Sequence, residues 1–158
     1  MFRGLVATEN NVALTVLRLF IAVVFFAHGA QKLFGWFGGP GFFGMMHGFE
    51  AQGIPSFFAF LAICAEFFGS LGLFAGFLTR IASLGIMINM IVAILTIHYR
   101  FGFFMNWTGG KPGEGFEYHL LAIGICLTLL IGGAGAASID RNLMRRSDRK
   151  AGMIRRVA

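Results

Sequence analysis

Nine polar side chains interrupt otherwise apolar stretches of this sequence: Arg18, His28, Gln31, Lys32, Glu66, Asn89, His98, Glu117 and His119. A charged side chain at the centre of a membrane-spanning helix costs about 2.5–3.5 kcal/mol by insertion measurements, so it usually marks a function or a specific pairing. The residue types are those of proton transfer and hydrogen bonding. Their expected depths divide them into an outer and an inner group.

The outer group contains His28, Gln31, Lys32, His98, Glu117 and His119. The first three occupy positions i, i+3 and i+4, which share one face of a helix. Glu117 is expected at the depth of Lys32 and is its predicted partner. Polar side chains that snorkel to the membrane surface would explain the same pattern. The functional interpretation is a pocket below the outer surface that binds a ring with carbonyl or hydroxyl groups.

A quinone would suit this pocket, because its head group needs hydrogen-bonding and proton-transfer groups while its tail stays in lipid. His28 and His119 are predicted to bind the two head-group oxygens, since a neutral imidazole both donates and accepts. We expect Glu117 to relay the proton outward, with Lys32 keeping it ionised. Gln31, Lys32 and His98 are the further predicted quinone contacts.

Metal or haem binding is disfavoured, because no predicted helix has His-x-x-x-His or Glu-x-x-His spacing and no Cys-x-x-Cys-His motif occurs. Cys64 and Cys126 each lie inside an apolar run. They are interpreted as small buried hydrophobic residues rather than a redox pair.

The inner group contains Arg18, Glu66 and Asn89. An ion pair between Arg18 and Glu66 would neutralise both charges, and Asn89 would satisfy a remaining hydrogen-bonding group. The alternative is that Arg18 snorkels to the headgroups while Glu66 stays protonated.

Four apolar stretches could carry these residues across a bilayer, since about 20 residues span its hydrocarbon core. They cover residues 12–34, 56–78, 81–98 and 116–137. Hydrophobic residues make up 57% of the chain and charged residues 13%, against about 25% charged in soluble domains. The sequence therefore predicts an all-α membrane bundle of four helices over residues 1–140. The Gly-rich outer loop, residues 35–55, can hold a short interfacial helix.

The basic residues predict the orientation. Seven of the 13 lysines and arginines lie in the tail, residues 141–158. A basic segment after a membrane helix is typical of the cytoplasmic side and can contact anionic lipid. Four crossings then place both termini in the cytoplasm, as expected for a multi-pass protein of the bacterial inner membrane. Nucleic-acid binding is disfavoured, because no folded basic face is predicted.

The sequence also resembles the DoxX family of small four-helix bacterial membrane proteins. The resemblance is carried by LRLFIAVVFFAHGAQKLFGWFGG (17–39), AEFFGSLGLFAGFLTRIAS (65–83), GEGFEYHLL (113–121) and GGAGAASIDR (132–141). It implies a link to quinone enzymes, since relatives include the membrane subunit of a thiosulfate:quinone oxidoreductase. The family's polar positions match Arg18, His28, Lys32, Glu66 and Glu117.

Three functions are compatible with the sequence. The first is a quinone-linked redox subunit, and the second is a non-catalytic anchor or assembly subunit for a partner complex. The third, a small-solute transporter, is less favoured because four short spans show no repeat. Some redox relatives carry a fused second domain that is not expected in this chain, so a protein partner or a homo-oligomer is expected.

Overall fold

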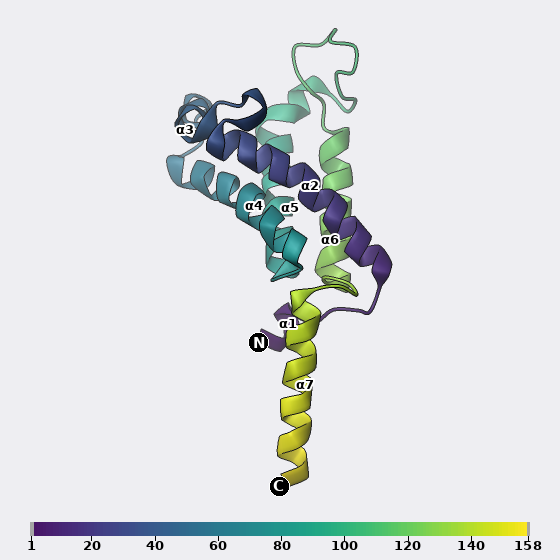
Figure 1. The fold of residues 1–158 in the computed structure, drawn as a ribbon. Helices are drawn as coiled ribbons and strands as arrows, with labels where there is room; N and C mark the ends of the chain where they lie inside the picture. The colour runs from purple at the N-terminus through teal and green to yellow at the C-terminus, as the bar shows by residue number, and fades with distance from the viewer. Residues whose placement is uncertain (1, 158) are drawn as a thin grey trace.

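The computed structural model describes the backbone of residues 2–157 and the side chains of residues 3–149, and the described chain is helical without strands (Figure 1). Its helices are α1 (Phe2–Leu5), α2 (Val12–Phe34), η1 (Trp36–Gly38), α3 (Gly41–Ala51), α4 (Ser56–Ala75), α5 (Thr79–Ala93), η2 (Ile94–His98), η3 (Tyr99–Phe101), α6 (Glu117–Gly132) and α7 (Ile139–Val157). The elements η1 and η3 are 3-10 turns, and η2 is a turn of π-helix.

Three helical segments are long and apolar enough to cross a membrane: α2, α4 and the continuous run Thr79–Phe101 formed by α5, η2 and η3. The fourth apolar helix, α6, is shorter. Its 16 residues extend about 24 Å at 1.5 Å per residue. The predicted helical membrane bundle is confirmed.

Glycines with positive φ end two helices earlier than the apolar runs suggest. The fourth span was predicted to reach residue 137, but α6 ends at Gly132, and Gly133 has φ 79°. The second was predicted to reach residue 78, but α4 ends before Gly76, which has φ 62°. Hydropathy does not register such stops, because the residues that follow are also apolar.

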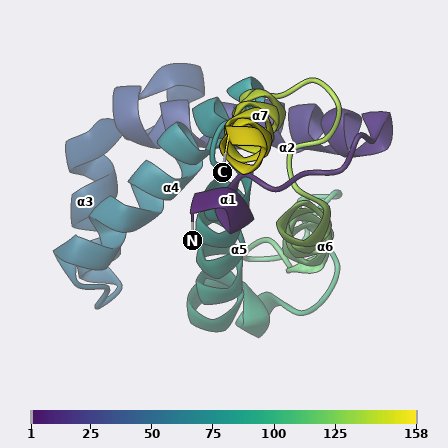
Figure 2. The ribbon, with the colours of Figure 1, turned by 90° about the horizontal axis from the view of Figure 1, so that it is seen from below.

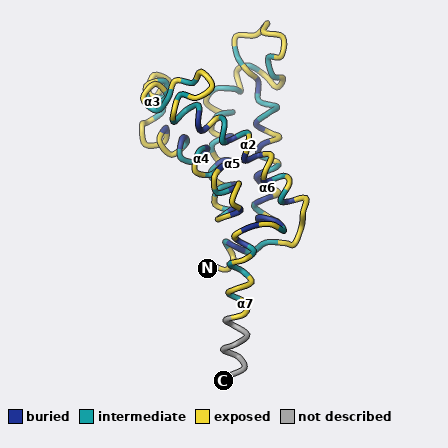
Figure 3. Tube along the Cα trace, viewed as in Figure 1, coloured by how far each residue is buried: buried dark blue, intermediate teal, exposed yellow. Residues whose placement is uncertain are grey.

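The bundle consists of two antiparallel pairs. Helices α2 and α4 form one pair and run obliquely across the other, α5 and α6 (Figure 1). Their contact buries an apolar core that includes Ile21, Phe25, Leu73, Ile86, Met90, Cys126 and Leu129. Large apolar side chains also cover the outside of the same helices, where much of the surface is exposed (Figure 3). That surface is suited to lipid.

The predicted short helix in the Gly-rich loop is α3, which has no buried residue and contacts the outer ends of α2 and α4. At the same end of the bundle, residues 102–116 form a loop that projects beyond the helices (Figure 1). The chain termini lie at the opposite end, which we call the inner end (Figure 1).

The inner end is fastened by charged side chains that cap helix termini. The Asp140 carboxylate accepts hydrogen bonds from the backbone N–H groups of Leu78 and Thr79, at 2.8 and 2.9 Å, and so caps the start of α5. Arg80 donates to the Leu130 and Ile131 carbonyls at the end of α6. These contacts tie the turn between α4 and α5 to the segment that follows α6.

Candidate functional site

Helices α2 and α4 approach each other closely at Gly29. A Cβ atom at this position would lie 2.6 Å from the Phe67 Cα, so no larger residue fits without moving a helix. The close approach places Lys32, one turn further along α2, beside Glu66 on α4.

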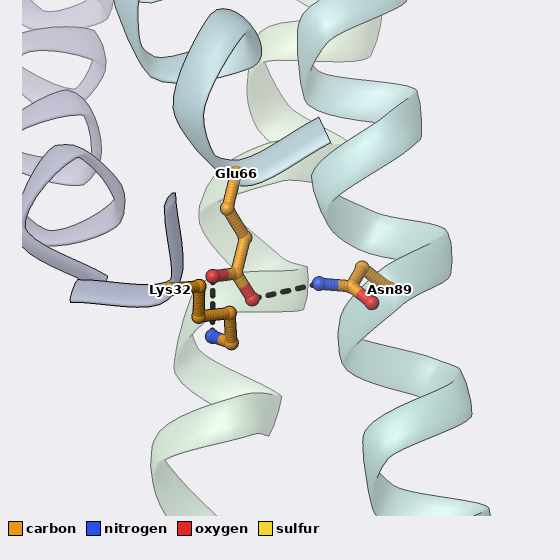
Figure 4. Close-up of polar contacts among 3 residues, drawn as sticks. All are labelled: Lys32, Glu66 and Asn89. Carbon is orange, nitrogen blue, oxygen red and sulfur yellow. Dashed lines mark hydrogen bonds and ion pairs between the residues drawn. The ribbon is translucent and has the colours of Figure 1, made fainter. Parts of the chain in front are cut away.

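Buried Glu66 is the centre of a polar triad whose other two members, Lys32 and Asn89, are half-buried. The Lys32 Nζ donates to its Oε2, and the Asn89 Nδ2 donates to its Oε1 at 2.8 Å (Figure 4). Glu66 is only 2% exposed. The ion pair leaves the triad neutral overall, which reduces the cost of placing a carboxylate inside a membrane bundle.

The predicted ion pair between Arg18 and Glu66 is therefore wrong. Arg18, 2% exposed, donates instead to the carbonyls of Leu73 and Phe74 at the end of α4 and of Ala137 after α6, at 2.8, 3.3 and 2.6 Å. The last carbonyls of a helix lack the full set of intrahelical donors, and the Arg18 guanidinium supplies donors at the end of α4. The part of the prediction that the structure reproduces is the contact between Asn89 and Glu66.

Glu117 is not the partner of Lys32 either. Its Oε1 accepts from the Met105 backbone N–H at 2.9 Å and from the Trp107 Nε1 at 3.2 Å. Both donors belong to the projecting loop. Glu117 thus holds that loop against the start of α6, and the predicted pairing of Lys32 with Glu117 is wrong.

Three histidines and Tyr118 form a row of neighbouring rings, in the order His28, Tyr118, His119 and His98. The ring centroids of His28 and Tyr118 are 6.1 Å apart, those of Tyr118 and His119 are 5.4 Å apart, and those of His119 and His98 are 4.1 Å apart. His28 is exposed and His119 is 6% exposed, so the row of rings leads from the bundle surface into its interior. His98 Nδ1 lies 2.8 Å from the Glu114 carbonyl in the loop.

The row of rings and the triad form one site, which we call the outer polar site. His28 and Lys32 lie four residues apart on one face of α2, which places the row of rings beside the triad. The site combines one fixed ion pair with several groups that can donate or accept protons.

Two polar atoms of this site are buried without a hydrogen-bond partner among residues 3–149: the Tyr118 hydroxyl oxygen and the His119 Nδ1. Tyr118 was not among the predicted site residues. The sequence feature that could have indicated it is a tyrosine, with its polar hydroxyl, between two polar residues at the start of an apolar helix.

Gln31 lies under the turn that follows α2, and the two cysteines are unpaired. Gln31 packs beneath Gly39, where a Cβ would lie 2.2 Å from its Cγ, and so supports the turn after α2. Cys64 and Cys126 are free thiols on different helices, the first half-buried and the second in the core. Within the described residues, no group of three or more His, Cys, Asp or Glu side chains could hold a metal ion.

A helical membrane bundle with a Lys–Glu ion pair inside it is thus the class of protein that fold and site define. The sequence model of the DoxX family matches residues 13–99, more than half of the chain, and the protein belongs to that family. The match covers α2 to α5 and ends before Tyr118 and His119.

Two relatives extend the similarity. The inner membrane protein YqjF of Escherichia coli is 33% identical over 137 residues, which cover 87% of this chain and 96% of that protein. The putative oxidoreductase CatD of Bacillus subtilis is 32% identical over 114 residues, which cover 72% of this chain and 75% of that protein. No solved structure matches the chain.

Proposed function

We propose that this chain is the membrane subunit of a quinone-linked redox system and that the outer polar site binds a quinone or quinol head group. The observation that supports the proposal is the pair of buried, unpartnered atoms on Tyr118 and His119. A buried polar group without a partner costs about 1–3 kcal/mol, so a ligand that pairs with both atoms recovers that energy on binding.

A quinone ring matches the chemistry of these atoms. Its carbonyl oxygens accept hydrogen bonds from a phenol or an imidazole, and the hydroxyls of the quinol can donate to an imidazole nitrogen. His119 would bind one head-group oxygen and exposed His28 the other, with Tyr118 between them as an additional donor. The exposed edge at His28 would let the apolar tail remain in lipid.

The Lys32–Glu66 ion pair places two fixed charges beside the proposed binding site. Both oxygens of Glu66 already accept hydrogen bonds, from Lys32 and Asn89, so Glu66 would not compete with the quinone for the hydrogen bonds of Tyr118 and His119. The relative named as a putative oxidoreductase supports the redox class. The alternative, a non-catalytic anchor for a partner complex, would leave the two unpartnered atoms without a role.

The proposed orientation places both termini in the cytoplasm. The outer polar site then lies within the bundle, towards the membrane surface opposite the cytoplasm. Both chain ends lie at the inner end, and seven of the 13 basic residues lie in residues 141–158 (Figure 1). The inner-membrane relative supports the location.

Quinone binding is tested with the full chain in lipid nanodiscs, titrated with a short-chain benzoquinone. We expect His28→Ala and His119→Ala each to weaken binding about two- to tenfold, since one hydrogen bond contributes about 0.5–1.5 kcal/mol. The matched control is His47→Ala, because His47 is exposed on α3, away from the row of rings. Unchanged affinity in both variants, or no binding by the wild type, would favour the anchor alternative.

A further inference from the structure

Helix α7 leaves the inner end of the bundle rather than folding back onto it. Figure 1 shows it continuing in the direction of α6, and in Figure 2 both helices are seen nearly end-on. Its 19 residues extend about 28 Å at 1.5 Å per residue. The helix therefore projects away from the membrane-spanning part.

The base of α7 is held to the bundle by several contacts. The Asp140 backbone N–H donates to the Gly76 carbonyl at 2.9 Å, and the Asp140 carboxylate caps α5. Arg141 donates to the Ala136 carbonyl at 2.9 Å. An ion pair between Arg3 and Asp148 adds a contact further along the helix. These contacts set the direction in which α7 projects.

Within residues 139–149, the part of α7 whose side chains the structure describes, one face carries three arginines and an asparagine. Asn142, Arg145, Arg146 and Arg149 occupy positions i, i+3, i+4 and i+7, and all four are exposed. We call these residues the arginine face. Asp140 and Asp148 lie on other sides of the helix by the same periodicity. Arg145 and Arg149, four residues apart, repel each other by about 0.2–0.5 kcal/mol, so the face is stabilised when an anion binds there.

The direction of α7 distinguishes between two kinds of anionic partner. Arg145 and Arg149 lie about 9 and 15 Å along the helix from Ile139. Electrostatic attraction to a flat headgroup surface decays over about 8 Å at physiological ionic strength. Arg145 thus lies about one screening length beyond Ile139 and Arg149 nearly two, so attraction to a headgroup surface at the base of the helix is weakened along this face. A soluble protein can contact the whole face at short range, which favours a protein partner over lipid.

We propose that the arginine face of α7 is the docking surface for a soluble cytoplasmic protein whose own surface carries clustered carboxylates. Guanidinium groups pair with carboxylates in a bidentate geometry, and opposite charge accelerates the encounter. The docking surface is separate from the outer polar site and does not depend on quinone binding.

The first step of the test is photo-crosslinking in cells of the native host. A photoreactive amino acid at Asn142 on the arginine face should capture a soluble cytoplasmic protein. The same amino acid at half-buried Ser147, on a different side of α7, serves as the matched control and should not. Capture of lipid or nucleic acid alone, or of a periplasmic protein, would overturn the proposal.

The second step measures charge dependence with purified components. The captured protein is titrated onto the full chain in nanodiscs of phosphatidylcholine, which carries no net charge. The triple variant R145E/R146E/R149E should weaken binding at least tenfold, whereas R145K/R146K/R149K should retain most of it. Thermal unfolding and quinone affinity of both variants should equal the wild type. Equal binding by the charge-reversed variant, or affinity that does not fall with added salt, would contradict docking by charge.

Discussion

Replacing Lys32 with alanine is expected to lower the free energy of unfolding by about 3–5 kcal/mol, because it leaves the buried Glu66 carboxylate without its cation. Glu66→Ala should be destabilising by a similar mechanism, since it leaves the Lys32 ammonium unpaired. The double variant removes both charges and should lose less than the sum of the two. Reversible unfolding in detergent micelles measures all three.

A double-mutant cycle distinguishes the Lys32–Glu66 pair from the Arg18–Glu66 pair that the sequence suggested. Groups in direct contact show coupling energies of about 0.5–3 kcal/mol, and we expect a value in this range for Lys32 with Glu66. The same cycle for Arg18 with Glu66 should give a value near zero, because Arg18 binds carbonyls elsewhere. The reverse outcome would contradict the triad.

Arg18→Ala is the second substitution with a large expected effect, a loss of about 3 kcal/mol or more. The guanidinium joins the end of α4 to the segment after α6 through three hydrogen bonds. Hydrogen bonds to a charged group contribute about 1.5–3 kcal/mol each. Thermal unfolding in nanodiscs measures the effect.

Two controls accompany this substitution. Arg145→Ala removes an exposed arginine and should change stability by less than about 0.5 kcal/mol. Arg18→Lys should recover only part of the loss, since an ammonium cannot match the fork of the guanidinium. If Arg18→Ala were no more harmful than Arg145→Ala, the inner end would not depend on this arginine.

The helical spans and the shared face of His28 and Lys32 follow from the sequence, because both depend on local periodicity and apolar length. The partner of Lys32 does not. The sequence argument placed the ends of all helices at the same membrane surface, which put Lys32 level with Glu117. In the structure the end of α2 packs beside the middle of α4, where the rings of Phe34 and Phe67 lie 5.1 Å apart. Lys32 is therefore level with Glu66.

The role of Glu117 depends on the fold of a loop that has no periodic pattern. Residues 102–116 return to their own start, where the Glu117 N–H donates to the Phe103 carbonyl at 2.9 Å. This return places Met105 and Trp107 against the Glu117 carboxylate. A Gly-rich segment predicts an irregular loop, but it does not predict which side chain fastens it.

The central claim, a quinone head group at the outer polar site, is tested most directly by photolabelling the full chain with an azidoquinone in nanodiscs. Mass spectrometry of the labelled peptides locates the head group. The label is predicted to concentrate on the peptides that contain His28 and Tyr118–His119, and excess unlabelled quinone should prevent it. Label spread over the lipid-facing residues of all helices, unaffected by competing quinone, would contradict the site.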